Sequence, residues 1–150
     1  MTEVVVAVDP GRDKCGVAVV SVSGQVEEKA VVEAGRLAAF VSRILADRRY
    51  RIAAVAVGDR TATAAVVERL KAAGVPAEHI YLVDEHRSSE VGRRRYWRDN
   101  PPRGWRRLIP VGLQVPPEPY DDYVAVELAF RYLASSGAGP EEDEKNARRK

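Results

Sequence analysis

Residues 4–18 read VVVAVDPGRDKCGVA, and this stretch decides how the chain begins to fold. Five apolar residues, four of them valine, are typical of a strand that is buried on both faces of a sheet. The run ends in Asp9, and Pro10-Gly11 then supplies turn chemistry before a second apolar run begins. An aspartate at the end of such a strand must lie where the sheet meets solvent, a partner or a metal ion. Asp9 is therefore the first candidate functional residue.

The composition is that of a soluble globular protein. The chain has 150 residues, of which 45% are hydrophobic and 31% are charged, enough for one domain with a real core. The single cysteine, Cys15, excludes an intrachain disulfide framework. No apolar stretch approaches the ~20 residues of a membrane span, and the N-terminus lacks the pattern of a secretory signal. We therefore expect a cytoplasmic protein with no membrane partner.

Hydrophobic periodicity predicts an α/β fold. The first three strands have short connections, so they are antiparallel neighbours, whereas the last two need crossover helices and run parallel to each other. The result is a mixed sheet with helices on its faces in a single domain over residues 1–134, followed by a disordered charged tail at 135–150. Prolines and glycines exclude long regular structure from residues 100–119. Strands are expected at residues 4–8, 16–22, 26–33, 52–57 and 80–83, and helices at 37–45, from 61 or 63 to 73, from 88 or 89 to about 97, and from 120 or 121 onward.

Acidic residues stand where three apolar elements begin or end. Asp9 follows the first strand, Asp84-Glu85 follow the fifth, and Asp121-Asp122 open the last helix. Each has an ordinary explanation, because Asp-Pro-Gly forms turns, acidic pairs are common in solvated loops, and aspartate is favoured at helix N-termini. If the elements converge, however, these hard oxygen ligands suit Mg²⁺. Two such ions would activate a water and stabilise the attacking and leaving oxygens of a phosphodiester.

The same residues carry a resemblance to a known family. Asp9-x-Gly11 followed by GVA at 16–18 resembles the first-strand motif of the YqgF (RuvX) family, Holliday-junction-resolvase-like nucleases of the RNase H superfamily. The sequence DEHRSS at 84–89 resembles that family's Asp-Glu-Arg-Leu-Thr-Thr. Asp121, with AVELAFRYL at 125–133, is similar to its final helix. The order and spacing match over most of residues 4–133.

The resemblance implies an RNase H-like fold with sheet order 3-2-1-4-5 and a metal site. Asp9, Glu85 and Asp121 would form the acidic triad that binds Mg²⁺ or Mn²⁺, and Asp122 is a substitute or fourth carboxylate. It further implies a nuclease that processes the ends of pre-16S ribosomal RNA or resolves branched DNA. The second of these activities would call for a homodimer.

Two positions depart from the family pattern. The fourth strand is followed by GDRT at 58–61 where the family usually has Gly-Leu-Pro, so the expected glycine-bearing loop is missing and Asp59 is added as a minor candidate ligand. His86 and Arg87 replace the family's arginine and leucine. These changes leave the local substrate contacts and the retention of activity open.

A basic segment supplies the second candidate site. From Arg87 to Arg107 there are eight arginines against two acids, although the net charge of the whole chain is only +2. Guanidinium groups pair with phosphates, and the interleaved Tyr96, Trp97 and Trp105 could stack on unpaired bases. The alternative is that aromatics pack on the core and arginines form a solvated face; mixed roles are expected. The candidates for nucleic-acid contact are Lys14, Arg87, Arg93, Arg94, Arg95, Arg98, Arg106 and Arg107.

The sequence thus favours a metal-dependent endonuclease acting on structured RNA or branched DNA. A second hypothesis is a non-catalytic nucleic-acid-binding module in which the carboxylates are only caps. A third, an actin-like or sugar-kinase-like ATPase, is disfavoured because the chain is too short for a second nucleotide-binding domain. Metal-dependent cleavage discriminates the first hypothesis from the second.

Overall fold

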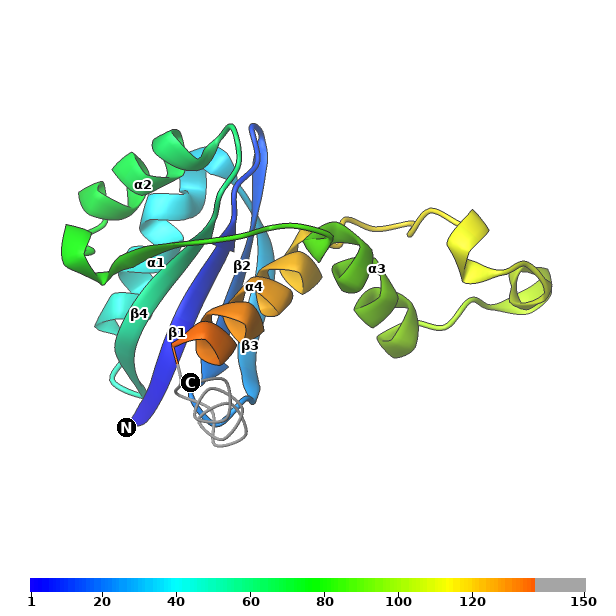
Figure 1. Ribbon diagram of the computed structural model, residues 1–150, viewed down its shortest axis with the longest axis horizontal. Helices are drawn as coiled ribbons and strands as arrows, with labels where there is room; N and C mark the ends of the chain where they lie inside the picture. Colours follow the sequence, from blue (N-terminus) through cyan, green and yellow to red (C-terminus); the bar gives the residue numbers. More distant parts are fainter. Residues whose placement is uncertain (137–150) are drawn as a thin grey trace, which may run out of the picture.

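The computed structural model describes residues 1–136, and Figure 1 shows a sheet flanked by helices with a long excursion on one side. The strands are β1 (Thr2–Asp9), β2 (Lys14–Ser21), β3 (Val26–Glu33), β4 (Tyr50–Gly58) and β5 (Ile80–Val83). The α-helices are α1 (Leu37–Ala46), α2 (Thr63–Ala72), α3 (Ser88–Asp99) and α4 (Asp121–Ser135). Residues 137–150, and with them most of the predicted tail, lie outside the described residues.

The five strands form one mixed sheet in the order β3-β2-β1-β4-β5. β1 pairs antiparallel with β2 and β2 antiparallel with β3, whereas β1, β4 and β5 run parallel. The predicted α/β class and the sheet order 3-2-1-4-5 are therefore confirmed. Because β1 and β4 are parallel neighbours, with Val8 opposite Val57, their carboxyl ends meet at the same edge of the sheet.

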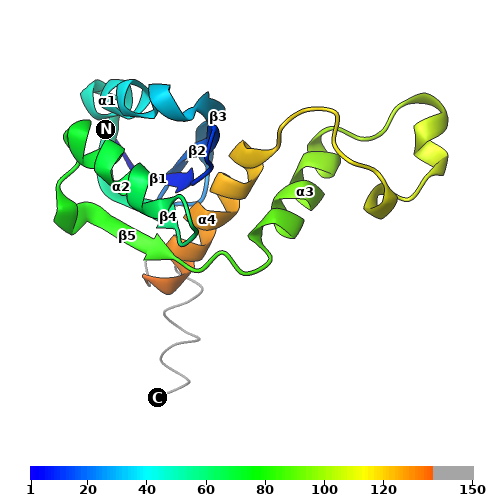
Figure 2. The same cartoon turned by 90° about the horizontal axis from the view of Figure 1, so that it is seen from above.

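The alternation of side chains along β1 divides the core between two faces. Val4, Val6 and Val8 are fully buried on the face that α1 and α2 cover. Val5 and Ala7 are buried on the other face, against α4. Figure 2 shows this three-layer arrangement, with α1 and α2 on one side of the sheet and α4 on the other. Since successive strand residues point to opposite faces, the residue that follows Val8 faces α4.

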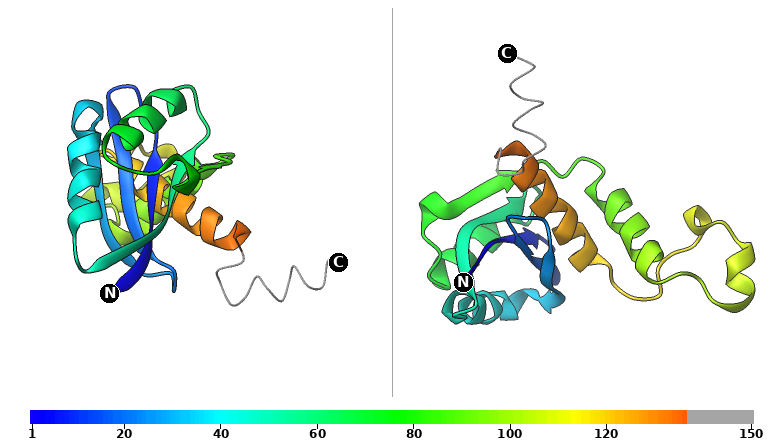
Figure 3. Two further views of the ribbon diagram at one scale, coloured as in Figure 1. Left: turned by 90° about the vertical axis from the view of Figure 1, so that its left-hand side faces the viewer. Right: turned by 90° about the horizontal axis from the view of Figure 1, so that it is seen from below.

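The third helix packs on α4 and not on the sheet. Gly92 of α3 lies against the backbone of Val124, where a Cβ atom would be too close, and the Tyr96 ring meets the Tyr123 ring edge-on at 5.6 Å. Beyond α3 the chain makes only the short 3-10 turns Gly104–Leu108 and Val111–Leu113 before it returns to α4. We call residues 100–120 the arm. It projects away from the sheet (Figure 3).

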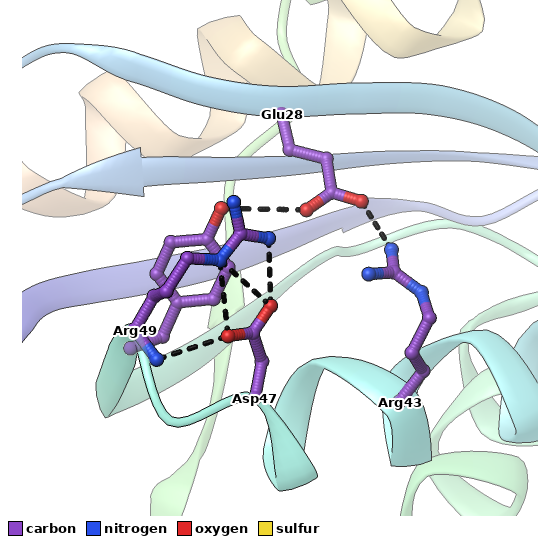
Figure 4. A network of polar contacts seen from close by, with 5 residues as sticks. Glu28, Arg43, Asp47 and Arg49 are labelled. Atoms are coloured by element: carbon purple, nitrogen blue, oxygen red, sulfur yellow. Dashed lines mark hydrogen bonds and ion pairs between the residues drawn. The ribbon is translucent and has the colours of Figure 1, made fainter.

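A polar network braces the face of the sheet that α1 covers. Glu28 of β3 forms an ion pair with Arg43 of α1 and accepts a hydrogen bond from Tyr50 (Figure 4). Next to it, Arg49 donates hydrogen bonds of 2.7–3.2 Å to Asp47. Hydrogen bonding by Arg49 lowers the pKa of Asp47 to about 2. These charges join β3, α1 and the start of β4, so this network has a structural role.

Within the described residues, no helix combines the length and hydrophobicity that crossing a membrane requires.

Candidate active site

Asp9 ends β1 on the face of the sheet that α4 covers. It pairs in register with Gly16 of β2, and its neighbour Val8 pairs with Val57 of β4. By the same alternation, Gly16 and Gly58 lie on the α4 face on either side of Asp9. Asp9 is 4% exposed, so a carboxyl group is buried between two residues that have no side chain.

Gly16 brings the start of α4 against the sheet. A Cβ atom at this position would overlap the backbone carbonyl of Asp121 and approach the amide of Asp122. The first turn of α4 therefore rests on the β2 backbone, next to the residue that pairs with Asp9. The absence of a side chain at residue 16 is what places Asp121 beside Asp9.

Gly58 does the same for Glu85 on the other side. A Cβ atom at residue 58 would overlap the Glu85 carboxyl group, which is 9% exposed and follows β5. The loop after β4 is fixed by Thr63, whose hydroxyl donates to the Gly58 carbonyl and accepts from the Arg60 amide, both at 2.6 Å. Two glycines, on the two strands that flank β1, thus bring the two outer acids toward Asp9.

Arg60 is the cation at the centre of this group. Its guanidinium forms an ion pair with Glu85 and donates a 2.9 Å hydrogen bond to the Ser89 hydroxyl. Burial raises the pKa values of Asp9 and Asp121, and the charge of Arg60 partly opposes that rise. One guanidinium therefore interacts electrostatically with all three predicted triad residues.

Burial dominates the titration of the two aspartates. It raises the pKa of Asp9 to about 7, against the opposing effect of Arg60, and the nearby Asp121 carboxylate adds to the rise. The pKa of Asp121 is also raised, by burial and by its neighbour Asp122, while Arg60 and Lys14 oppose the shift. Asp9 and Asp121 are thus close enough to repel each other.

The donor atoms fit a hard divalent cation. Oδ1 of Asp9 and Oε1 of Glu85 are buried, and neither accepts a hydrogen bond from another described residue. The Arg60 Nε is paired with Oε2 of Glu85 and leaves Oε1 without a donor. Carboxylate oxygens that lack donors are what Mg²⁺ or Mn²⁺ takes as ligands.

These donors are not gathered into one coordination sphere. Across residues 1–136, no three His, Cys, Asp or Glu side chains lie close enough together to hold a metal ion. Asp9 and Asp121 repel each other, and Arg60 is the cation that offsets their charge. The elements that carry the three acids adjoin one another, but the side chains around Arg60 would have to rearrange to bind a divalent ion.

Asp122 is paired with Lys29 and not with the residues around Asp9. Its Oδ2 accepts a 3.3 Å hydrogen bond from the ammonium group of Lys29 of β3. The same ammonium group lies 4.2 Å from the centre of the Tyr123 ring. Asp122 is therefore engaged on the β3 side, whereas Asp121 interacts with Asp9. Asp59, the minor candidate ligand, is exposed.

The predicted nucleic-acid contacts divide into two classes. Arg95 packs onto α4, where it forms a 3.0 Å ion pair with Glu127 and lies 4.9 Å from the centre of the Phe130 ring. It therefore fixes α3 to α4. Arg94 and Arg98 are exposed and have no ion-pair partner within residues 1–136; with Val91 and Arg95 they line a cavity of about 350 Å³.

The other candidates lie on β2, at the start of α3 or within it, and in the arm. Lys14, Arg87, Arg106 and Arg107 are exposed, and Arg93 is half-buried. Arg87 adopts a left-handed conformation with φ of 59° at the start of α3. Tyr96 is a buried anchor, as one alternative for the aromatics predicts, but Trp105 is 69% exposed and packs on no core.

Arg60 was not identified as a functional residue from the sequence. The signal that could have found it is positional: residue 60 follows the end of β4, the parallel neighbour of the strand that ends in Asp9. A cation at that place lies among the acids that parallel strands bring to one edge.

Comparison with solved structures identifies the fold. Thermus thermophilus RuvC in complex with a Holliday junction substrate matches with a TM-score of 0.57 and 22% identity, over 90% of this chain and 96% of that chain. A second Thermus thermophilus RuvC structure matches with a TM-score of 0.52 and 22% identity, over 90% and 97% of the two chains. No protein-family model matches the sequence, and no curated protein matches it. The chain thus has the RNase H-like fold that RuvC has, while its likeness to the YqgF family stays a resemblance.

Proposed function

We propose that this protein is a metal-dependent endonuclease that hydrolyses phosphodiester bonds in structured nucleic acid. The observation that carries the proposal is the placement of Asp9, Glu85 and Asp121 around one edge of an RNase H-like sheet, with buried carboxylate oxygens that lack donors. RuvC, whose fold this chain shares, is a protein solved with a Holliday junction substrate, which supports a branched or structured substrate here.

In this proposal Asp9, Glu85 and Asp121 hold one or two Mg²⁺ or Mn²⁺ ions. Such ions would supply charge stabilisation to the phosphodiester and lower the pKa of a water molecule. Asp9 is the central ligand, because it lies between the elements that carry the other two. Asp121 is preferred over Asp122, because Lys29 engages Asp122.

The basic residues would position the strand. Lys14 is exposed and close enough to affect the pKa of Asp121, so it is placed to contact a phosphate near the acids. Arg94 and Arg98 offer guanidinium groups on the outer face of α3, where phosphates farther along the strand would bind.

Two classes of substrate are candidates for the proposed nuclease. The resemblance to the YqgF family favours the ends of pre-16S ribosomal RNA, and the shared fold with RuvC favours four-way DNA junctions. One gel compares them: purified protein is incubated with each substrate, with and without Mn²⁺. We expect cleavage of one substrate that requires Mn²⁺ and falls at least about 100-fold in the Asp9→Asn variant, because an anionic ligand is lost.

A specific observation favours a second candidate function. The three acids do not share a coordination sphere and Arg60 already compensates their charge, as expected of a nucleic-acid-binding module that does not cleave. The same gel separates the two functions. A binding module would retard both substrates without cleaving either at any Mn²⁺ concentration, and that result would overturn the nuclease proposal.

A further inference from the structure

The arm and the end of α3 enclose a cavity of about 470 Å³, separate from the acidic site. This volume lies within the range of small-molecule binding sites. Neither Asp9, Glu85 nor Asp121 lines it, although Glu118 does and precedes Asp121 by three residues. The cavity is therefore adjacent in the chain to the acidic site and distinct from it.

The wall of the cavity that α3 provides is aromatic and firmly held. Trp97 lines the cavity, and its ring meets the buried Tyr96 ring edge-on at 5.3 Å. Asn100 ties this wall to α4, because its amide donates to the Tyr96 carbonyl at 3.1 Å and to the Tyr123 hydroxyl at 3.2 Å. A rigid aromatic surface of this kind binds planar rings with little loss of conformational entropy.

The opposite wall is held by Gln114. Its amide nitrogen donates to the backbone carbonyls of Arg106 and Ile109, at 2.8 and 2.9 Å, and so closes the arm on itself. The cavity is thus built by specific side-chain contacts on both sides.

The polar groups of the cavity suit a neutral heterocycle in an anionic chain. The cavity is lined by two cations, Arg103 and Arg106, and by two acids, Asp99 and Glu118, so it offers partners both to a phosphate and to the amino groups of a base. The indole Nε1 of Trp97 is buried and has no acceptor among the described residues. A base with amino donors would satisfy the acids, and its ring face would lie against the indole ring of Trp97.

We propose that this cavity binds one unpaired nucleotide of the nucleic-acid substrate, with its base against Trp97 and its phosphates toward Arg103 and Arg106. The proposal rests on the proposed function only in taking nucleic acid as the ligand. Continuity of the surface supports it: Arg94 and Arg98 lie on the helix that ends in Trp97 and Asp99, so a strand that follows α3 reaches the cavity.

Fluorescence tests this directly, because the chain has only two tryptophans. In the Trp105→Phe variant Trp97 is the sole indole. We expect its emission to be quenched by an unstructured single-stranded tetranucleotide in EDTA, and to be unchanged by a blunt duplex or by inorganic phosphate. Equal quenching by phosphate would mean a simple anion site, and no quenching by the single strand would mean no base at Trp97; either result overturns the proposal.

Matched variants measure the contribution of the cavity to binding. Trp97→Leu should weaken single-strand affinity about tenfold, the lower part of the range for one stacked base, whereas Trp105→Leu should change it by less than about twofold. Arg103→Ala should weaken binding more than Arg107→Ala, since Arg107 does not line the cavity and its Nε donates to the Gly104 carbonyl. This second pair keeps the test valid if Trp97→Leu impairs folding. Equal losses within both pairs would contradict the proposal.

All these measurements are made without a divalent metal. Loss of the nuclease proposal would therefore leave quenching of Trp97 intact, and loss of the nucleotide site would leave Mn²⁺-dependent cleavage intact.

Discussion

The Arg60 guanidinium is paired with the Glu85 carboxylate, and it also donates a 2.9 Å hydrogen bond to Ser89 at the start of α3. Arg60 is 40% exposed at its side chain, whereas that of Glu85 is only 6% exposed. A cation at the rim therefore compensates an acid in the interior. This relationship gives Arg60 the place that a divalent ion would take between the acids, and the first prediction follows from it.

The Arg60→Ala variant should bind Mn²⁺ on the order of tenfold more tightly than wild type. The guanidinium lies among Asp9, Glu85 and Asp121, so its removal ends its competition with Mn²⁺ for these carboxylates. Because the guanidinium is partly exposed to solvent, this competition amounts to about 1–2 kcal/mol. Isothermal titration calorimetry with Mn²⁺ measures the effect. Arg48→Ala is the matched control, because this exposed arginine precedes β4 at the opposite end of the strand. Unchanged or weaker binding by Arg60→Ala would show that Arg60 does not compete with the ion.

The Asp9→Asn variant should be more stable than wild type at pH 8 in EDTA. Burial raises the folded-state pKa of Asp9 to about 7, above its ordinary value of 3.8, so the folded state disfavours the charged form. Wild type therefore loses stability as pH rises from about 4 to about 7, and the loss is complete above that window. At ~1.4 kcal/mol per pKa unit the loss is about 4 kcal/mol at most.

Chemical denaturation at pH 4.5 and pH 8 measures this difference. The free energies of unfolding of the two proteins should nearly coincide at pH 4.5 and diverge at pH 8, with wild type the less stable. If the difference in free energy of unfolding between the two proteins is the same at pH 4.5 and pH 8, the Asp9 carboxyl is not the titrating group.

Two glycine substitutions should have different consequences. In Gly58→Ala the new methyl group meets the end of the flexible Glu85 side chain, so the fold survives and the carboxylate moves. In Gly16→Ala the methyl group meets the backbone of Asp121 and Asp122, which cannot move without displacing α4. We expect Gly58→Ala to retain most of its stability while losing Mn²⁺ affinity, and Gly16→Ala to lose about 2 kcal/mol or more of stability. Thermal unfolding and Mn²⁺ titration of both variants distinguish these outcomes. A Gly16→Ala protein as stable as wild type would show that the contact is not tight.

Replacing Arg94 and Arg98 together by alanine should weaken nucleic-acid binding and reduce its dependence on salt. Each phosphate contact contributes about −0.9 to the slope of log K against log salt for duplex DNA, so the slope should become about two units shallower. Binding to a duplex at several salt concentrations measures it. The control is the double variant Arg36→Ala and Arg48→Ala, which removes the same charge on the other side of the sheet, next to α1. An equal change in both slopes would mean that only net charge matters.

Arg95→Ala should behave differently from its neighbour Arg94→Ala. Arg95 pairs with Glu127 and lies on the Phe130 ring, so its loss should lower the free energy of unfolding by about 1 kcal/mol with a smaller effect on the salt slope. Denaturant titration of the two single variants compares them. If Arg94→Ala proves the more destabilising of the two, the division of this helix into a packed and an exposed arginine is wrong.

The elements of the sheet were predictable because their hydrophobic runs are short and strongly β-branched. The antiparallel pairing of the first three strands followed from their short connections. Periodicity does not say that β4 lies next to β1; the full order 3-2-1-4-5 came from the resemblance, and the pairing of β1 with β4 bears it out. Asp9 could be singled out because a charge at the end of a buried strand requires an explanation.

The details of the site depend on contacts that have no trace in local sequence. Arg94 and Arg95 are adjacent and chemically identical, and only the packing of α3 on α4 separates an exposed residue from a paired one. The glycines at 16 and 58 look like ordinary strand residues until the acids that rest on them are known. Asp121 and Asp122 are adjacent and of the same residue type, and the ion pair of Asp122 with Lys29 of β3 distinguishes them.

The segment made of α3 and the arm lies in the chain between the two outer acids, Glu85 and Asp121. After β5 the chain passes through Glu85, forms α3 and the arm, and returns to the sheet at Asp121. Both roots of this excursion are thus tethered to the same edge of the sheet. A displacement of this segment would therefore act on Glu85 and Asp121 together, whereas Asp9 belongs to the central strand of the sheet.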